Sequence, residues 1–259
     1  MSSEVETSRE ITWSNAPGVP QLHCAPPGMT EQLFAALAVY EDITPRSAAI
    51  NMAIDETLLE TAVVPTIRFY RWRSPALSFG YFGKFSDVSI YAAERDLVRR
   101  WTGGGIVFHG EDLTYSIVIP ASDAAFAESS LAIYEKVHRA LCAALNGVGE
   151  CASLVGSARC ADRMPQPGVP TNNCFANPVN ADVIMDGRKV AGAAQRHTYR
   201  GLLHQGSIQG ITLGTDLAEK FAQALSANCS EFELNEQIFQ RAQDLAREKY
   251  GTDSWLHKR

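Results

Sequence analysis

The sequence predicts an α+β domain built on a mixed, mostly antiparallel sheet with flanking helices. Helical and strand-like segments are intermixed along the chain, without the regular strand–helix–strand alternation of a parallel α/β fold. The dipeptide Asp186-Gly187 separates two short apolar segments, which is the strongest local signal for a β-hairpin. With 259 residues, of which 46% are hydrophobic, the chain is long enough to bury a substantial core.

Charge and hydropathy exclude several classes of protein. A formal net charge of −6 argues against a general nucleic-acid binder, because attraction to phosphate needs a basic surface. No apolar run is long enough to cross a bilayer, and the N-terminus lacks a basic-then-apolar signal pattern. We therefore expect a cytoplasmic protein without a membrane partner, whose six cysteines are reduced thiols rather than a disulfide framework.

A single domain is expected over residues 31–259, preceded by a leader. Residues 1–30 contain four prolines and little periodicity, so we expect this leader to be poorly ordered. Helical periodicity begins after Ser47, a favourable N-cap residue. A long helix ends near Gly147 or Gly149 and carries His138 on its apolar face, where we expect a packed histidine rather than a catalyst. Further helices are expected near residues 86–95, 215–225 and 235–250.

Strand-like segments fill most of the remaining chain. They lie at residues 66–72, 76–81, 97–100, 106–109, 113–119, 181–185, 188–194 and 201–208. Residues 152–173 are rich in Pro, Gly, Asn and Ser, which predicts a long loop. Loops of this length are commonly functional or mobile, and this one leads directly to Cys174.

A run of three glycines, Gly103–Gly105, is the first candidate for a ligand-binding segment. Glycines have no side chain, so a ligand can touch the backbone directly there. The run leads into a strand and lacks the Gly-Lys-Ser/Thr sequence of a phosphate-binding loop. A bare triplet is more often a turn, but the preceding Arg99 and Arg100 and the flanking strands favour a binding role.

Cys174 and Lys189 form the second candidate. A cysteine is a useful nucleophile only as a thiolate, and a nearby ammonium lowers the pKa of its thiol. Lys189 follows Cys174 by fifteen residues, across the expected hairpin, so the two side chains can approach each other. The alternative is that Cys174 is a small buried residue without a chemical role. His109 and His204 are weaker candidates for a base, and no metal site is expected because the chain has no zinc-binding motif.

Taken together, these segments resemble the superfamily of lipoate ligases and octanoyltransferases, which also includes biotin protein ligases. The resemblance extends from about Arg46 to residues 255–259 and implies one catalytic domain of this type over residues 31–259. It further implies that the glycine loop and the lysine segment wall a narrow tunnel for a medium-length acyl chain. It rests on Arg-Arg-x-Thr-Gly-Gly-Gly-x-Val-x-His at residues 99–109 and Gly-Arg-Lys-Val-Ala-Gly-Ala-Ala-Gln-Arg at residues 187–196.

Within that superfamily, Cys174 before Lys189 is similar to the cysteine-dependent octanoyltransferases. The resemblance implies that Cys174 is the nucleophile and that Lys189 favours its thiolate and binds the acyl carbonyl. It implies octanoyl-acyl carrier protein as donor, a lipoyl-accepting protein (glycine cleavage H protein or a 2-oxoacid dehydrogenase E2 domain) as acceptor, and no cofactor. The implied substrate-binding residues are Arg99, Arg100, Thr102, Gly103, Gly104, Gly105, His109, Gly192 and Gln195.

Three other functions remain open from the sequence. An ATP-dependent lipoate-protein ligase, which needs ATP and Mg²⁺, ranks second, because it activates its acid as an adenylate and has no need of Cys174. Only about fifty residues follow Ser207, which also favours a transferase over ligases with an accessory domain. An octanoyl amidotransferase acting between lipoyl domains ranks third. A non-catalytic lipoyl- or acyl-binding protein is the alternative from a different class.

Overall fold

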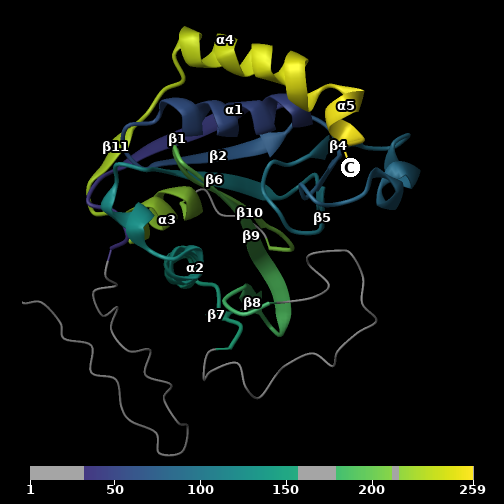
Figure 1. Cartoon of the computed structure of the whole chain (residues 1–259). Coiled ribbons are helices and arrows are strands. Elements are labelled where there is room, and N and C mark those ends of the chain that lie inside the picture. Colours follow the sequence, from purple (N-terminus) through teal and green to yellow (C-terminus); the bar gives the residue numbers. More distant parts are fainter. Residues whose placement is uncertain (1–31, 157–178, 212–215, 259) are drawn as a thin grey trace, which may run out of the picture. The chain divides into compact units, whose positions relative to one another are not determined.

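The computed structural model describes residues 32–156, 179–211 and 216–258. Eight strands form the main sheet, and three form a smaller one (Figure 1). In spatial order, the main sheet consists of β11 (Cys229–Glu231), β1 (Leu37–Arg46), β2 (Thr66–Trp72), β6 (Leu113–Pro120), β10 (Gly201–Ile208), β9 (Arg188–Thr198), β8 (Val183–Met185) and β7 (Ala152–Leu154). The smaller sheet consists of β4 (Asp96–Arg99), β3 (Ala76–Phe79) and β5 (Ile106–His109).

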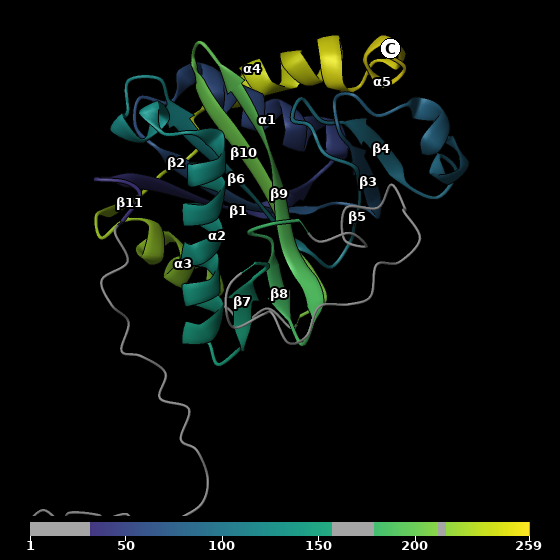
Figure 2. The same cartoon turned by 60° about the horizontal axis from the view of Figure 1, so that its bottom comes forward.

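Helices cover both faces of the main sheet. On one face lie α1 (Ala48–Thr61) and α4 (Glu236–Leu245), and on the other lie α2 (Ser130–Gly147) and α3 (Leu217–Leu225) (Figures 1 and 2). A short last helix, α5 (Asp253–Leu256), packs against β4. Among the described helices, none combines the length and apolar character needed to span a bilayer.

Strand alternation divides the interior into two hydrophobic cores. Ile67 and Phe69 of β2 pack with α2 and α3, whereas Tyr70 packs with α1 and α4. In the same way, Leu202 and Leu203 of β10 face opposite cores. Successive side chains of a strand point to opposite faces, so the central strands β2, β6 and β10 are buried on both sides.

Most of the sheet is antiparallel, as the sequence predicts. β6, β10 and β9 form an antiparallel ladder, and β8 joins it through the Asp186-Gly187 hairpin. Both hairpin residues have positive φ, 48° for Asp186 and 75° for Gly187, the backbone conformation that a tight two-residue hairpin turn requires. Parallel pairs join β1 to β2 and to β11, and β3 to β4, so the expectation of a mixed sheet is confirmed.

The helix start at Ser47 is confirmed, but its cap comes from elsewhere. Ser47 has extended backbone angles and makes no side-chain cap hydrogen bond. Instead, Asp96 at the start of β4 accepts a 2.9 Å hydrogen bond from the backbone N–H of Ala48. A carboxylate at a helix N-terminus also interacts favourably with the helix dipole. This contact ties α1 of the main layer to the smaller sheet.

Several expectations from the sequence need correction. Residues 86–95 do not form one helix but two short 3₁₀ turns, Phe85–Asp87 and Ser89–Tyr91. The loop expected from residue 152 begins with strand β7, and the sequence patterns missed β1 and β11. The last long helix is α-helical only over Glu236–Leu245 and ends in a π-helical turn at Ala246–Tyr250. The leader expected at residues 1–30 lies outside the described residues.

Candidate active site

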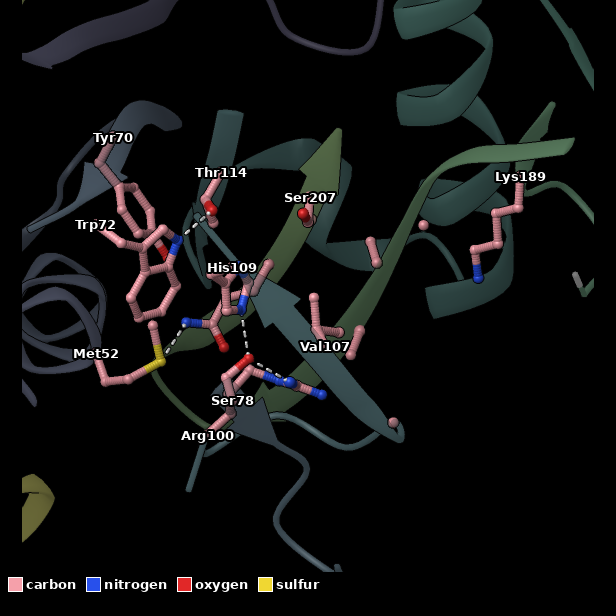
Figure 3. Close-up of a pocket in the computed structure, with 16 residues that line it drawn as sticks. Met52, Tyr70, Trp72, Ser78, Arg100, Val107, His109, Thr114, Lys189 and Ser207 are labelled. Atoms are coloured by element: carbon pink, nitrogen blue, oxygen red, sulfur yellow. Dashed lines mark hydrogen bonds between the residues drawn. The ribbon is translucent and has the colours of Figure 1, made fainter. Parts of the chain in front are cut away.

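A pocket opens between the two sheets, beside the glycine loop. The empty space in it, counted with its open mouth, is about 500 Å³. Figure 3 shows Lys189 at one end and Met52, Tyr70 and Trp72 at the other. The lining residues are Met52, Tyr70, Trp72, Ser78, Arg100, Gly104, Val107, His109, Thr114, Lys189, Gly192, Ala193, Ala194, Gln205, Gly206 and Ser207.

Lys189 is held by a buried carboxylate. Its Nζ lies 2.7 Å from Oδ2 of Asp182, and the exposed fractions of the two side chains are 6% and 0%. Asp182 precedes β8, and Lys189 lies at the start of β9, so the hairpin brings the pair together. A buried charge is tolerated only when it is paired and hydrogen-bonded, and here each side chain supplies the other's partner.

Asp182 is itself fixed by two further donors. The hydroxyl of Tyr134, on α2, donates to Oδ1 at 2.5 Å, and the backbone N–H of Val179 donates to Oδ2 at 2.7 Å. The Tyr134 oxygen also accepts a 3.2 Å hydrogen bond from the backbone N–H of Ala193, a pocket-lining residue. Burial and the neighbouring Asp182 raise the pKa of Tyr134, so its hydroxyl stays a proton donor.

Gly192 makes room for the lysine. A Cβ at this position would lie 2.5 Å from Cε and 2.6 Å from Nζ of Lys189, closer than real Cβ contacts. It would also lie 3.1 Å from Oδ1 of Asp182. A larger residue at position 192 would therefore displace the end of the Lys189 side chain from its place beside Asp182.

His109 occupies the centre of the pocket in a linear polar array. Its Nδ1 lies 2.7 Å from Oδ2 of Asp112, and its Nε2 lies 2.7 Å from Oγ of Ser78. Burial lowers the pKa of His109 despite the hydrogen bond from its ring to Asp112. A neutral imidazole that donates from Nδ1 to the carboxylate leaves Nε2 to accept the Ser78 hydroxyl proton.

Further side chains contact the His109 and Asp112 members of this array. The indole ring of Trp72 stacks on His109 with centroids 4.0 Å apart, and its Nε1 donates to Thr114 at 2.7 Å. Thr114 and Ser207 both donate to Asp112, at 2.9 and 2.7 Å. Burial would raise the pKa of Asp112, but hydrogen bonds from His109, the Gly110 N–H and Ser207 hold it below its usual value.

The guanidinium of Arg100 donates hydrogen bonds to the backbone of the glycine loop. It donates to Oγ of Ser78 at 2.7 Å and to the carbonyl oxygens of Gly103 and Gly105 at 3.0 and 2.9 Å. Gly104 has a φ of 85°, a region that favours glycine, and its backbone touches Gly80: a Cβ on Gly80 would lie 2.0 Å from the Gly104 oxygen. Arg100 therefore lines the pocket and at the same time fixes the loop beside it.

Five implied binding residues are not among the described residues that line the pocket: Arg99, Thr102, Gly103, Gly105 and Gln195. Arg99 is fully buried and donates to the carbonyl oxygens of Tyr81, Gly83, Trp255 and Leu256 at 2.7–2.9 Å. Thr102 donates to Oε1 of Gln205 at 2.8 Å, and Gln195 lies 3.0 Å from Nδ1 of His204. Their role in substrate binding stays a prediction.

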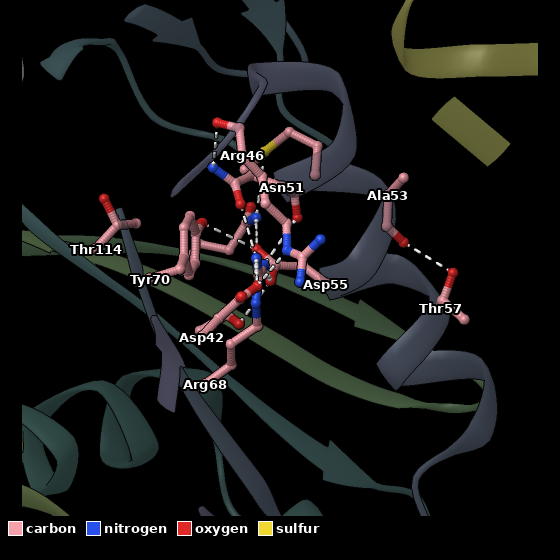
Figure 4. A network of polar contacts seen from close by, with 12 residues as sticks. Asp42, Arg46, Asn51, Ala53, Asp55, Thr57, Arg68, Tyr70 and Thr114 are labelled. Carbon is pink, nitrogen blue, oxygen red and sulfur yellow. Dashed lines mark hydrogen bonds and ion pairs between the residues drawn. The ribbon is translucent and has the colours of Figure 1, made fainter. Parts of the chain in front are cut away.

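A buried charge network lies beneath the pocket (Figure 4). Arg68 on β2 bridges Asp42 and Asp55, each at 2.8 Å, and its side chain and both carboxylates are at most 1% exposed. Asp55 also accepts from Gln205, a lining residue, at 2.7 Å. The network thus fixes the pocket floor to α1 and to β1.

Of the implied site, the structure brings Arg100, Gly104, His109, Lys189 and Gly192 to one pocket. Cys174 lies outside the described residues, so its place relative to Lys189 stays a prediction. Sequence reasoning missed a group of polar side chains that support the pocket: Ser78, Asp112, Tyr134, Asp182 and Gln205.

The fold and this site define an α+β domain with an open, partly apolar pocket flanked by a glycine loop and a paired lysine. Residues 47–240 match the family model of the lipoyl protein ligase A/B catalytic domain, and the chain belongs to this family. Octanoyltransferase LipM of Oceanobacillus iheyensis is 38% identical over 173 residues, covering 64% of this chain but only 61% of the relative. Octanoyltransferase LipM of Symbiobacterium thermophilum is 32% identical over 256 residues, covering 79% of this chain and 92% of the relative.

Solved structures show the same fold. A putative lipoate protein ligase of Thermoplasma acidophilum, with bound lipoic acid, superimposes with a TM-score of 0.64 at 20% identity, covering 86% of this chain and 99% of its own. A lipoate-protein ligase A bound with ATP gives the same TM-score and identity and is covered over 98% of its length. At this identity the likeness establishes the fold class, which agrees with the α+β expectation.

Proposed function

We propose that this protein is an octanoyltransferase that acts in protein lipoylation. The observation that carries the proposal is the match to a relative named octanoyltransferase over 92% of that relative's length, together with the pocket that holds Lys189. The donor is octanoyl-acyl carrier protein, and the acceptor is a lysine of a lipoyl-accepting protein. Because the acyl group arrives as an activated thioester, the reaction needs neither ATP nor a metal ion.

The proposed reaction runs through a thioester at Cys174. Its thiolate attacks the carbonyl carbon of the donor thioester, and the carrier-protein thiol leaves. The acceptor lysine then attacks the enzyme thioester, which releases Cys174 and forms the amide. The Lys189 ammonium, held beside Asp182, stabilises the negative charge that develops on the carbonyl oxygen in both steps.

The acyl chain is proposed to lie along the pocket from Lys189 toward Met52 and Trp72. Small residues Gly192, Ala193 and Ala194 of β9 form one wall, and Val107 of β5 faces the pocket as well. These residues leave a slot that suits an unbranched chain better than a bulky group. The glycine loop supplies backbone rather than side chains at Gly104.

The decisive experiment is transfer from octanoyl-acyl carrier protein to a lipoyl domain, with and without ATP and Mg²⁺. We expect equal rates under both conditions. Without acceptor, intact-mass analysis should show one octanoyl group that hydroxylamine removes and that maps to Cys174. Cys174→Ser should abolish transfer, whereas the matched control Cys151→Ser, at an exposed cysteine, should not change it. A strict requirement for ATP with free octanoate or lipoate would replace the transferase by a ligase.

A further inference from the structure

We propose that Asp182 protects Lys189 from being acylated by the enzyme's own substrate. The inference rests on the proposed octanoyl transfer, in which the acceptor nucleophile is a lysine amine. Lys189 lines the same pocket as the acyl chain and carries the same functional group as that acceptor. An enzyme of this design has to hold a lysine beside a reactive thioester without allowing it to react.

Whether Lys189 reacts with the thioester depends on whether its amine is protonated. A neutral amine has a lone pair that attacks a thioester, whereas an ammonium has none. Water stabilises the ammonium of a surface lysine, but Lys189 is only 6% exposed, and burial without a partner favours the neutral amine. The Asp182 carboxylate, 2.7 Å from Nζ and fully buried, favours the charged form instead.

The structure holds this carboxylate rigidly. Tyr134 and the Val179 N–H donate to its two oxygens, so Asp182 cannot turn away from Lys189 without losing both hydrogen bonds. Gly192 leaves the space in which the lysine stem lies. The ammonium is thereby confined to a position where it binds a carbonyl oxygen but offers no nucleophile to the carbonyl carbon.

The reaction that Asp182 prevents is an ordinary aminolysis. The Nζ lone pair of neutral Lys189 attacks the thioester carbonyl carbon, the C–S bond breaks, and the thiolate leaves with the proton released from nitrogen. The product is an octanoyl amide on Lys189 and a free thiol. Unlike the thioester at Cys174, this amide does not turn over, so each such event inactivates one enzyme molecule.

Asp182→Asn in the full-length protein tests the proposal. Wild type and variant are incubated with the octanoyl thioester of N-acetylcysteamine, treated with hydroxylamine to remove thioesters, and analysed by intact mass and peptide mapping. We expect the variant to gain one hydroxylamine-stable octanoyl group on Lys189 at least about tenfold faster than wild type, because one opposite charge has been removed. Asp182→Glu, which keeps the charge, should stay close to wild type.

Two controls assign the adduct. Lys84, an exposed lysine, should be labelled equally in wild type and variant, which measures the general reactivity of the reagent. The double variant Asp182→Asn/Lys189→Met should collect no excess stable adduct. A folded Asp182→Asn protein whose Lys189 is labelled no faster than in wild type would overturn the proposal, since a purely structural ion pair predicts a loss of stability alone.

A second variant covers the case in which Asp182→Asn does not fold. Tyr134→Phe keeps the carboxylate but removes the 2.5 Å hydrogen bond that fixes it, and should label Lys189 faster than wild type. Unchanged labelling in Tyr134→Phe overturns the proposal in that case. Wild-type transfer from octanoyl-acyl carrier protein is measured separately, and its absence would refute the proposed function. Normal wild-type transfer, combined with no faster labelling of Lys189 in Asp182→Asn, would refute this inference alone.

Discussion

Ser78 and His109, on neighbouring strands β3 and β5, share a 2.7 Å hydrogen bond at the centre of the pocket. Arg100 donates to the same serine oxygen, so the hydroxyl proton of Ser78 points to His109. Asp112, His109, Ser78 and Arg100 thus form one continuous chain that ends on the carbonyl oxygens of the glycine loop. Hydrogen bonds thus link the buried imidazole of His109 to the backbone of the glycine loop.

Ser78→Ala should lower the free energy of unfolding by about 1–3 kcal/mol, because it removes the hydrogen bonds that the buried side chains of His109 and Arg100 make to this hydroxyl. Urea denaturation measures this loss. The matched control is Ser86→Ala at an exposed serine, which should change the same free energy by less than about 0.5 kcal/mol. Equal stability of the two variants would show that the polar chain does not stabilise the loop.

Gly192→Ala should reduce octanoyl transfer by about a hundredfold, since a displacement of about 1 Å at a reacting group has an effect of this size. The new Cβ would lie 2.5 Å from Cε of Lys189 and force the lysine away from Asp182. Gly110→Ala is the control, because no atom lies within 4 Å of its Cβ position. Steady-state transfer kinetics compare the two variants, and an active Gly192→Ala enzyme would contradict the assigned position of the lysine.

Arg68→Met should destabilise the protein by about 3–5 kcal/mol, because it removes the opposite charge that pairs with the buried Asp55 and leaves Asp42 with Arg46 alone. The exposed pair of Arg241 with Glu60 serves for comparison: Arg241→Met should cost less than about 1 kcal/mol. Chemical denaturation of both variants decides the matter. Similar losses would mean that the network under the pocket contributes no more than a surface ion pair.

Stability should fall as the pH drops below about 6.5, the pKa of histidine in an unfolded chain. Burial lowers the pKa of His138 to about 4 and also lowers the pKa values of His109 and His204. Below about pH 6.5 the unfolded state therefore binds protons that the folded state does not bind. His138 alone accounts for a loss of about 3 kcal/mol between pH 6.5 and 4.

Urea denaturation between pH 7.5 and 4.5 measures this loss. The stability of His138→Gln should depend less steeply on pH than that of wild type, because one of the buried histidines has been removed. Asp112 and Asp42, whose pKa values are lowered, lose their stabilising effect only near and below pH 4, outside most of this range. A wild-type stability independent of pH between 6.5 and 4.5 would contradict the prediction.

The sequence predicted those features that depend on short-range patterns. Asp186-Gly187 forms its hairpin because both residues tolerate positive φ, and the helix after Ser47 follows its apolar periodicity. β1 was missed because its charged residues Glu41 and Asp42 break the apolar pattern, and the burial of Asp42 depends on Arg68 of another strand, which pairs with it in addition to Arg46 of its own strand. Such pairing across the fold leaves no local trace in the sequence.

The same distinction between short-range patterns and long-range pairs applies to the pocket. Arg100, Gly104 and His109 reach the pocket because they flank one loop, and Lys189 and Gly192 because they share one strand. The partners that fix them come from distant segments: Tyr134 is 48 residues from Asp182, and Ser78 is 31 residues from His109. Neither spacing matches a helical or strand period, so only the folded chain reveals these pairs.

The contacts of Arg99 have a consequence for the order in which the protein matures. Its guanidinium is completed by carbonyl oxygens of Trp255 and Leu256, the former 156 residues further along the chain. A ribosome delivers Arg99 long before these two acceptors, so until residues 255 and 256 emerge its guanidinium has only the carbonyl oxygens of Tyr81 and Gly83 as partners in the described structure. The strand that leads into the glycine loop therefore gains its full set of hydrogen bonds only after the end of α5 has been synthesised.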